Sequence, residues 1–171
     1  AEIVEKWIAE RKDERIRFYN LPERGKYPKN PRKRWWVAGT TPSNKGLDMA
    51  RGEWIAPLDD DDEFTPGHIE EMLKFALENG LEVVYGKIMM EFADGTWIER
   101  GSEPFRVGHV CHLGVMYHKR LGFLRYDIQS YKYGEPGDWN IWRRMQDAGA
   151  VIGFFPSVVG IHYKEFTRLG K

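Results

Sequence analysis

The chain has 171 residues, of which 42% are hydrophobic and 30% are charged. This composition supplies a core and a soluble surface, which excludes an intrinsically disordered chain and a small disulfide-stabilised domain. The 26 Lys and Arg residues balance the 26 Asp and Glu residues, so the net charge is zero and a wholesale electrostatic interaction with nucleic acid is not expected. No apolar run reaches the roughly 18 residues of a transmembrane helix.

The compartment is indicated by two further features. Cys111 is the single cysteine and has no partner for an internal disulfide, which is compatible with a reducing compartment. The first residues, Ala1 to Lys6, contain no apolar signal-peptide core. The expected location is therefore the cytoplasm, with peripheral attachment to a membrane as the alternative.

Hydrophobic spacing and turn residues predict the elements of the first half. In chain order they are a helix over 1–11, a strand over 15–19, a long irregular loop over 21–42, a short helix over 44–51 and a strand over 53–58. The basic residues of this half gather in one place: the stretch Arg11 to Arg34 holds ten Lys or Arg and three acids. Such a stretch suits a phosphate-bearing ligand, and a solvated loop is the alternative.

The second half alternates strands with helices. The predicted elements are a helix that begins near Thr65 and ends at Gly80, a strand over 81–85, a hairpin of 87–92 and 96–99 around Asp94-Gly95, a strand over 110–117, a helix over 138–148, and strands over 151–155 and 158–162. This alternation predicts an α/β fold with a mixed sheet flanked by helices.

Four consecutive aspartates, Asp59 to Asp62, follow the predicted strand 53–58. Their mutual repulsion is relieved only by a cation or by wide exposure to solvent. Open α/β sheets bind ligands at the carboxyl ends of strands, and carboxylates suit Mg2+, Mn2+ or Ca2+. An acidic turn before the next helix is the alternative. An EF-hand is excluded, because Phe64 stands where that loop requires glycine.

Three stretches resemble glycosyltransferase family 2, whose members have the GT-A fold. Asn44 to Asp62 is similar to the pattern N-x-G-x-x-x-A-x-G-E-aromatic-I followed by L-D-x-D-D. Gly137 to Arg144 resembles the start of that family's E-D-W-D-L-W-x-R helix, and Gly160 to Tyr163 resembles the region of its late histidine. The resemblance covers roughly residues 1 to 165.

The resemblance implies a Rossmann-like GT-A domain, specific for nucleotide-diphosphate sugars, that is N-terminally incomplete. The family's opening strand, helix, strand and D-D-G-S-like turn, which read the nucleoside base, have no counterpart here. The 171 residues are therefore expected to form a single GT-A-like catalytic domain or its C-terminal two-thirds. The chain alone is expected to bind donor poorly, with the missing segment supplied in the full-length protein or by a homo-oligomer.

The resemblance also implies a metal and donor site. Asp59 and Asp61 correspond to the DxD signature, and Asp61 is the expected ligand of Mn2+ or Mg2+ on the donor diphosphate. Asp59 is expected to hold the metal or the ribose, Asp60 to orient the sugar or ribose, and Asn44 to contact the donor. His162 is expected to bind the metal or the diphosphate, and a strand-end histidine bonded to backbone is the alternative.

Asp138 corresponds to the catalytic base of the family. Its carboxylate is expected to accept the proton of an acceptor hydroxyl during attack on the anomeric carbon. The alternative is an N-cap for the helix that follows.

The implied function is an inverting transfer of a sugar, by a hexosyltransferase-like enzyme, from a nucleotide sugar to a saccharide, lipid or other hydroxyl acceptor. A non-catalytic sugar- or nucleotide-binding remnant is the alternative, and a nucleic-acid-binding module built on Arg24 to Trp36 is a third. Trp35 and Trp36 are expected to pack locally, with stacking on a sugar or base as the other interpretation. His112 is interpreted as a core or surface histidine.

Overall fold

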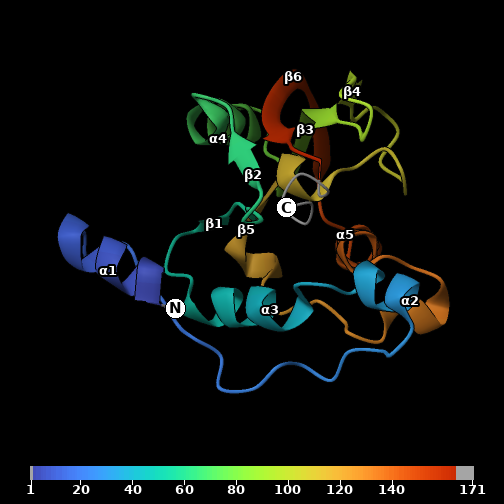
Figure 1. Cartoon of the computed structure of the whole chain (residues 1–171). Helices are drawn as coiled ribbons and strands as arrows, with labels where there is room; N and C mark the ends of the chain where they lie inside the picture. The colour runs from blue at the N-terminus through green and yellow to red at the C-terminus, as the bar shows by residue number, and fades with distance from the viewer. Residues whose placement is uncertain (1, 165–171) are drawn as a thin grey trace.

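The computed structural model describes residues 2–164, which form a mixed sheet with helices on both faces (Figure 1). Within these residues the sheet has six strands in the order β1-β5-β3-β6-β2, and β4 pairs with β3 outside this path. The strands are β1 (Trp54–Ile55), β2 (Asp62–Phe64), β3 (Val83–Glu91), β4 (Trp97–Arg100), β5 (Val115–His118) and β6 (Ile152–His162). Only β3 and β6 are parallel. The predicted α/β class with a mixed sheet is confirmed.

Two of the five α-helices described within residues 2–164 cover opposite faces of this sheet. The helices are α1 (Glu2–Arg11), α2 (Pro31–Trp36), α3 (Thr40–Met49), α4 (His68–Glu78) and α5 (Gly137–Asp147). Side chains alternate along a strand, so Val83 and Tyr85 pack with Trp142 of α5, whereas Val84 packs with Met72 of α4. The helices α5 and α4 therefore pack on opposite faces of β3.

The region between α1 and β1 differs from the prediction. Residues 15–19 form no strand, because they have no neighbouring strand among residues 2–164, and the Asp13 carboxylate instead binds Arg15. The predicted loop over 21–42 contains α2 and the start of α3. Asn30 caps α2 by accepting a hydrogen bond from the Lys33 N–H at 3.1 Å, and Pro31 occupies the first turn.

Several predicted boundaries are also wrong. The strand expected over 53–58 is only Trp54–Ile55, because β5 pairs with just these two residues. Thr65 does not cap α4: its N–H donates to the Val159 carbonyl of β6 at 3.1 Å, and Gly67 takes the N-cap position with a φ of 84°.

The remaining differences lie in the second half. The strand expected over 110–117 begins with a short 3-10 helix, His112–Gly114, before β5. The two strands expected near the end of the chain are one strand, β6, with a register shift opposite Gly86 to Ile88. The predicted helix over 1–11, the hairpin around Asp94-Gly95 and the helix over 138–148 are confirmed to within a few residues.

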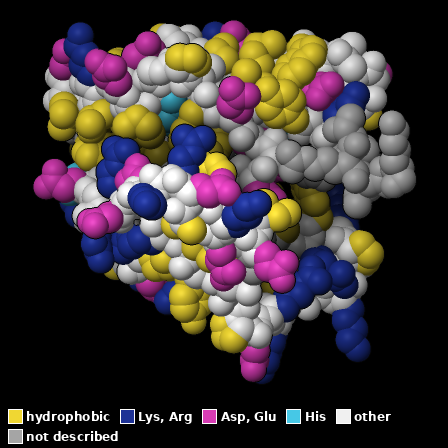
Figure 2. All heavy atoms as spheres, turned by 60° about the vertical axis from the view of Figure 1, so that its left-hand side comes forward, with side chains coloured by type: hydrophobic (Ala, Val, Ile, Leu, Met, Phe, Trp, Pro, Cys, Tyr) yellow, Lys and Arg dark blue, Asp and Glu magenta, His cyan; other side chains and the backbone are white. Residues whose placement is uncertain are grey.

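The surface presents no single-sign patch on the face drawn in Figure 2, where basic and acidic side chains are interspersed. α1 lies to one side of the sheet (Figure 1), and none of its described residues is buried. Within residues 2–164, no helix combines the length and apolar content needed to cross a bilayer.

Trp142 is the largest fully buried side chain of the described core. We expect Trp142→Ala to lower the free energy of unfolding by about 3–5 kcal/mol, because the cavity left between α5 and the sheet cannot close. Urea unfolding followed by circular dichroism measures this loss. Trp7→Ala on the exposed α1 is the control and is expected to change stability by about 0.5 kcal/mol or less. Equal losses in the two variants would contradict the packing described here.

Candidate active site

A cavity of about 470 Å3 lies where α2, the start of α3, the acidic turn, and the ends of β3 and β6 meet the first turn of α5. Asp59, Asp62, His112, Asp138 and His162 all line it. The sheet and α5 thus bring together side chains that are far apart in the sequence. A concave site with a few convergent polar groups is typical of small-molecule binding.

The Asp59 carboxylate is held by the side chain of His112. The His112 Nδ1 lies 3.1 Å from Asp59 Oδ2, and its Nε2 lies 2.9 Å from the Tyr126 hydroxyl. His112 also stacks near Trp142, with ring centroids 5.9 Å apart. An imidazole fixed on both nitrogens keeps one orientation, so Asp59 is presented to the cavity in a defined position.

Asn44 holds the main chain of Tyr126, the residue whose hydroxyl contacts His112. Its side-chain amide donates to the Tyr126 carbonyl at 2.9 Å, and its side-chain carbonyl accepts from the Tyr126 N–H at 2.9 Å. Asn44 does not line the cavity. In this structure it fixes the main chain that carries Tyr126, and through Tyr126 the ring of His112.

Asp62 and His162 form the second carboxylate–imidazole pair of the cavity. They face each other across β2 and β6, with His162 Nδ1 2.7 Å from Asp62 Oδ1. The Asp62 side chain is only 3% exposed. Asp60 and Asp61 do not line the cavity. Burial and the neighbouring Asp62 and Asp60 charges raise the pKa of the Asp61 carboxyl, as expected for a carboxylate that gains from a nearby cation.

The side chains of the cavity include oxygen and nitrogen ligands suited to Mn2+ or Mg2+. Among residues 2–164, no three His, Cys, Asp or Glu side chains are gathered as a preformed metal cluster. Mg2+ is usually held by one or two carboxylates plus substrate phosphates and water, so such a cluster is not required. Two carboxylates and one imidazole, from Asp59, Asp62 and His162, open on the same cavity and fit a cation that arrives with a diphosphate.

Asp138 lies in the first turn of α5 and lines the same cavity as Asp59 and Asp62. The predicted N-cap role is wrong, because Pro136 occupies that position and makes no side-chain cap. The Asp138 carboxylate accepts a hydrogen bond from the Trp139 N–H at 2.7 Å. A carboxylate at a helix N-terminus is stabilised as the anion, the form in which it accepts a proton.

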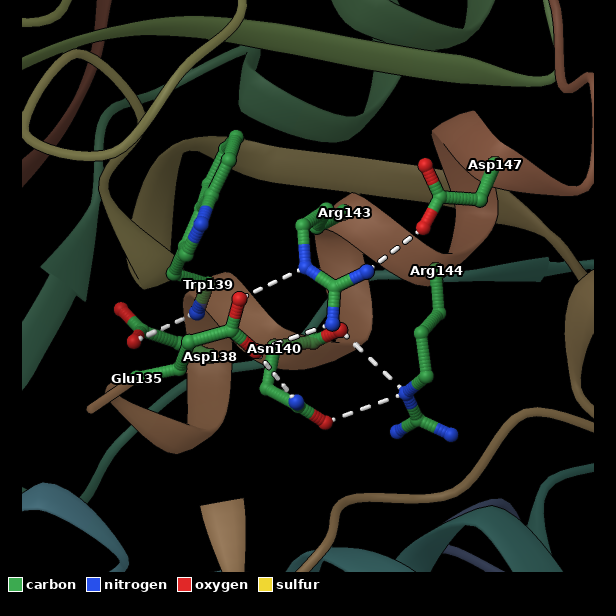
Figure 3. A network of polar contacts seen from close by, with 7 residues as sticks. All are labelled: Glu135, Asp138, Trp139, Asn140, Arg143, Arg144 and Asp147. Carbon is green, nitrogen blue, oxygen red and sulfur yellow. Dashed lines mark hydrogen bonds and ion pairs between the residues drawn. The ribbon is translucent and has the colours of Figure 1, made fainter. Parts of the chain in front are cut away.

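A separate ion-pair network holds the helix that carries Asp138 (Figure 3). Glu135 accepts hydrogen bonds from Arg143 at 2.6 Å and from Asn140 at 2.6 Å, and Arg143 also pairs with Asp147. None of these ion pairs reaches Asp138, whose one bond marked in Figure 3 comes from Trp139. The network fixes α5 and leaves the Asp138 carboxylate without a cationic partner in the group drawn.

Cys111 also lines the cavity, where its surroundings disfavour the thiolate form. Burial, with a further contribution from the Asp138 charge, raises the pKa of its thiol to about 11. The thiol is therefore neutral near pH 7.

The structure places three of the predicted site residues, Asp59, Asp138 and His162, around one cavity. Sequence reasoning missed two that share it. Asp62 is the last residue of the aspartate run, but no role of its own was predicted for it. His112 was interpreted as an ordinary core or surface histidine, since nothing in its spacing from Asp59 indicates their contact.

The Asp59–His112 pair predicts a pH dependence of stability. The hydrogen bond from His112 holds the pKa of Asp59 below 3.8. Burial lowers the pKa of His112, but the hydrogen bond and charge of Asp59, with Asp138 and Asp62, outweigh it and raise the pKa above 6.5. The stabilisation by Asp59 is lost as pH falls through its lowered pKa, and that by His112 is lost as pH rises through its raised pKa.

We therefore expect the wild-type protein to lose unfolding free energy as the pH rises from about 6.5 through the raised pKa of His112. His112→Gln should remove this alkaline loss, because glutamine does not titrate. Urea unfolding at a series of pH values measures it in both proteins. An alkaline loss of the same size in the variant would contradict the assignment.

Two of the comparisons with known proteins find matches to this chain. Residues 1–146 match the family model described as Glycosyl transferase family 2. A comparison with curated proteins finds no match.

Solved structures give the fold. The crystal structure of S. aureus TarS 1-349 in complex with UDP-GlcNAc is 15% identical with a TM-score of 0.58, over 96% of this chain and 46% of that chain. The complex of TarS 1-349 with UDP is 14% identical with a TM-score of 0.57, over 75% and 41% of the two chains. The chain thus spans less than half the length of these structures. At such identities the similarity shows a shared fold, which confirms the predicted GT-A architecture.

Proposed function

Since the chain belongs to glycosyltransferase family 2, we propose that the protein moves a sugar from a nucleotide-diphosphate sugar to an acceptor hydroxyl, with inversion at the anomeric carbon. The observation that carries this proposal is the single cavity shared by the acidic pairs, Asp59–His112 and Asp62–His162, and by Asp138. Such a cavity gathers carboxylates that suit a cation-bound diphosphate and a further carboxylate, Asp138, that suits a base.

In the proposed reaction Asp138 accepts the proton of the acceptor hydroxyl. The acceptor oxygen forms a bond to the anomeric carbon while the bond from that carbon to the diphosphate oxygen breaks. The nucleoside diphosphate leaves with the electron pair of the broken bond. Because attack and departure occur on opposite faces of the sugar, the configuration inverts.

The acidic side of the cavity is proposed to bind Mn2+ or Mg2+ together with the donor. Asp59, which lines the cavity, and Asp61, which lies in the same turn outside the lining, are the proposed carboxylate ligands, and Asp62 bonds His162 at the cavity wall. When bound, the cation neutralises the charge that develops on the departing diphosphate. Asp60 lies in the exposed part of the same turn and is proposed to orient the ribose or the sugar.

The identity of the donor is tested with a panel of nucleotide sugars. UDP-GlcNAc is the first candidate, because TarS, which shares this fold, has been solved with it. The full-length protein is incubated with Mn2+ and with UDP-, GDP- and dTDP-sugars, and release of nucleoside diphosphate is measured. We expect turnover with one nucleotide class. Metal-dependent binding of a donor without any turnover would support the sugar-binding alternative, and neither binding nor turnover would overturn both.

A further inference from the structure

A second cavity, of about 570 Å3, adjoins the proposed active site. It lies between the segment 21–27, α2 and the first residues of α3. Trp35 and Ala38 line both cavities, so they form the ridge that separates the two. A ligand that crosses this ridge would occupy the second cavity with one part and reach the active site with another.

The walls of this second cavity are held by specific contacts. The Thr41 N–H donates to the Tyr27 hydroxyl at 3.2 Å, and the Arg34 guanidinium donates to the Pro28 and Lys29 carbonyls at 3.2 and 3.1 Å. The first bond ties the segment 21–27 to α3, and the other two tie the residues that follow this segment to α2. The cavity is therefore formed in the protein itself, as is usual for ligand sites.

The charge of this region is opposite to that of the active site. Residues 24–34 contain six Lys or Arg and no Asp or Glu. Arg24 lines the cavity and, within residues 2–164, makes no hydrogen bond or ion pair; Glu23 is the acid of the lining. The adjoining active-site cavity is lined instead by three aspartates. An anionic group that is not paired with a cation is thus favoured in the second cavity over the first.

The ridge itself offers an apolar platform. The side chain of Trp35 is 61% exposed, although an indole of this size is usually packed away from water. An indole ring has apolar faces and a polar N–H at one edge. It therefore suits a sugar ring, which is also apolar on a face and polar at its rim. A saccharide chain that extends from one cavity to the other would pass over Trp35.

We propose that the second cavity is an acceptor subsite for a saccharide that carries an anionic group, a phosphate or a carboxylate. The anionic group binds beside Arg24, the sugar ring lies on Trp35, and the free hydroxyl reaches Asp138. This inference rests on the proposed glycosyl transfer, since it assigns the acceptor side of the same site. The second cavity then favours anionic acceptors over neutral ones.

Binding of a defined anionic saccharide tests the proposal without knowledge of the natural acceptor. The probe is trehalose 6-phosphate, and trehalose is its neutral counterpart; binding to the full-length protein is measured by calorimetry. We expect trehalose 6-phosphate to bind at least about tenfold more tightly than trehalose, because a charge-assisted pair with Arg24 is available to it alone. Equal affinities, or no binding of the phosphorylated sugar at millimolar concentration, would overturn the proposal.

Variants locate the binding. Arg24→Ala and Trp35→Ala are each expected to weaken the binding of trehalose 6-phosphate by about tenfold. Lys26→Ala is the matched control: it removes a cation from the same segment outside the lining, and its effect should stay within about twofold. Both substituted side chains are exposed, so loss of the fold is not expected, and circular dichroism checks it. Unchanged affinity in both cavity variants would overturn the proposal.

Two competitors and one variant separate this inference from the proposed function. UDP with Mn2+ and a single-stranded RNA oligonucleotide should not displace trehalose 6-phosphate; displacement by either would assign the cavity to the donor or to nucleic acid instead. If sugar transfer occurs but Arg24→Ala changes no anionic-saccharide affinity, this inference alone fails. If trehalose 6-phosphate binds as expected but no donor is turned over, the proposed function alone fails.

Discussion

Asp138→Asn is expected to lower kcat for sugar transfer by about a hundredfold to ten-thousandfold. Asparagine has nearly the same shape and can still accept the hydrogen bond from the Trp139 N–H, but it cannot take the proton of the acceptor hydroxyl. Donor binding should change little, because the acidic wall of the cavity is untouched. Transfer kinetics and donor calorimetry on the same preparation measure both quantities.

Asp147→Asn is the matched control on the same helix. Asp147 pairs with Arg143 at the surface and does not line the cavity. An exposed ion pair contributes about 1 kcal/mol or less, so this variant should fold and keep the wild-type kcat. A residual activity of the Asp138 variant above about a tenth of wild type would exclude Asp138 as the base.

The sequence predicts those parts of the fold that depend on local chemistry. The helix over 138–148 has apolar residues at helical spacing, and Asp94-Gly95 supplies the turn that a hairpin needs, so both are confirmed. Residues 15–19 alternate as a strand does, but a strand also requires a neighbour, and no alternation pattern supplies one. The prediction there failed for lack of a partner, not for lack of propensity.

The candidate site could be predicted only in part, for a similar reason. The aspartate run and Asp138 were singled out by motifs whose residues are adjacent in the chain. His112 and Tyr126 act through contacts that depend on how β5, α3 and α5 pack together. Asn44 was expected to contact the donor, whereas its side chain is occupied by the Tyr126 main chain. A motif residue can therefore mark the scaffold of a site as well as its chemistry.

Removal of divalent cations is expected to reduce transfer at least about a hundredfold, since the charge on the leaving diphosphate would then be uncompensated. Addition of excess Mn2+ or Mg2+ after EDTA treatment should restore the activity. Activity that persists at full level in EDTA would contradict the proposed role of the cation. The same assay, run as a titration with Mn2+, then distinguishes the individual aspartates.

Asp61 and Asp62 are expected to respond differently in that titration. Asp61→Asn should raise the Mn2+ concentration for half-maximal activity without a loss of stability, because the Asp61 carboxylate is destabilised by burial and by its acidic neighbours. Asp62→Asn should instead lower the free energy of unfolding, because the buried Asp62 carboxylate bonds His162 at 2.7 Å. Glu63→Gln is the control, since Glu63 bonds Tyr163 outside the cavity. If Asp61→Asn leaves the Mn2+ dependence at the wild-type value, the cation is held by Asp59 and Asp62 instead, since these are the carboxylates of the turn that open on the cavity.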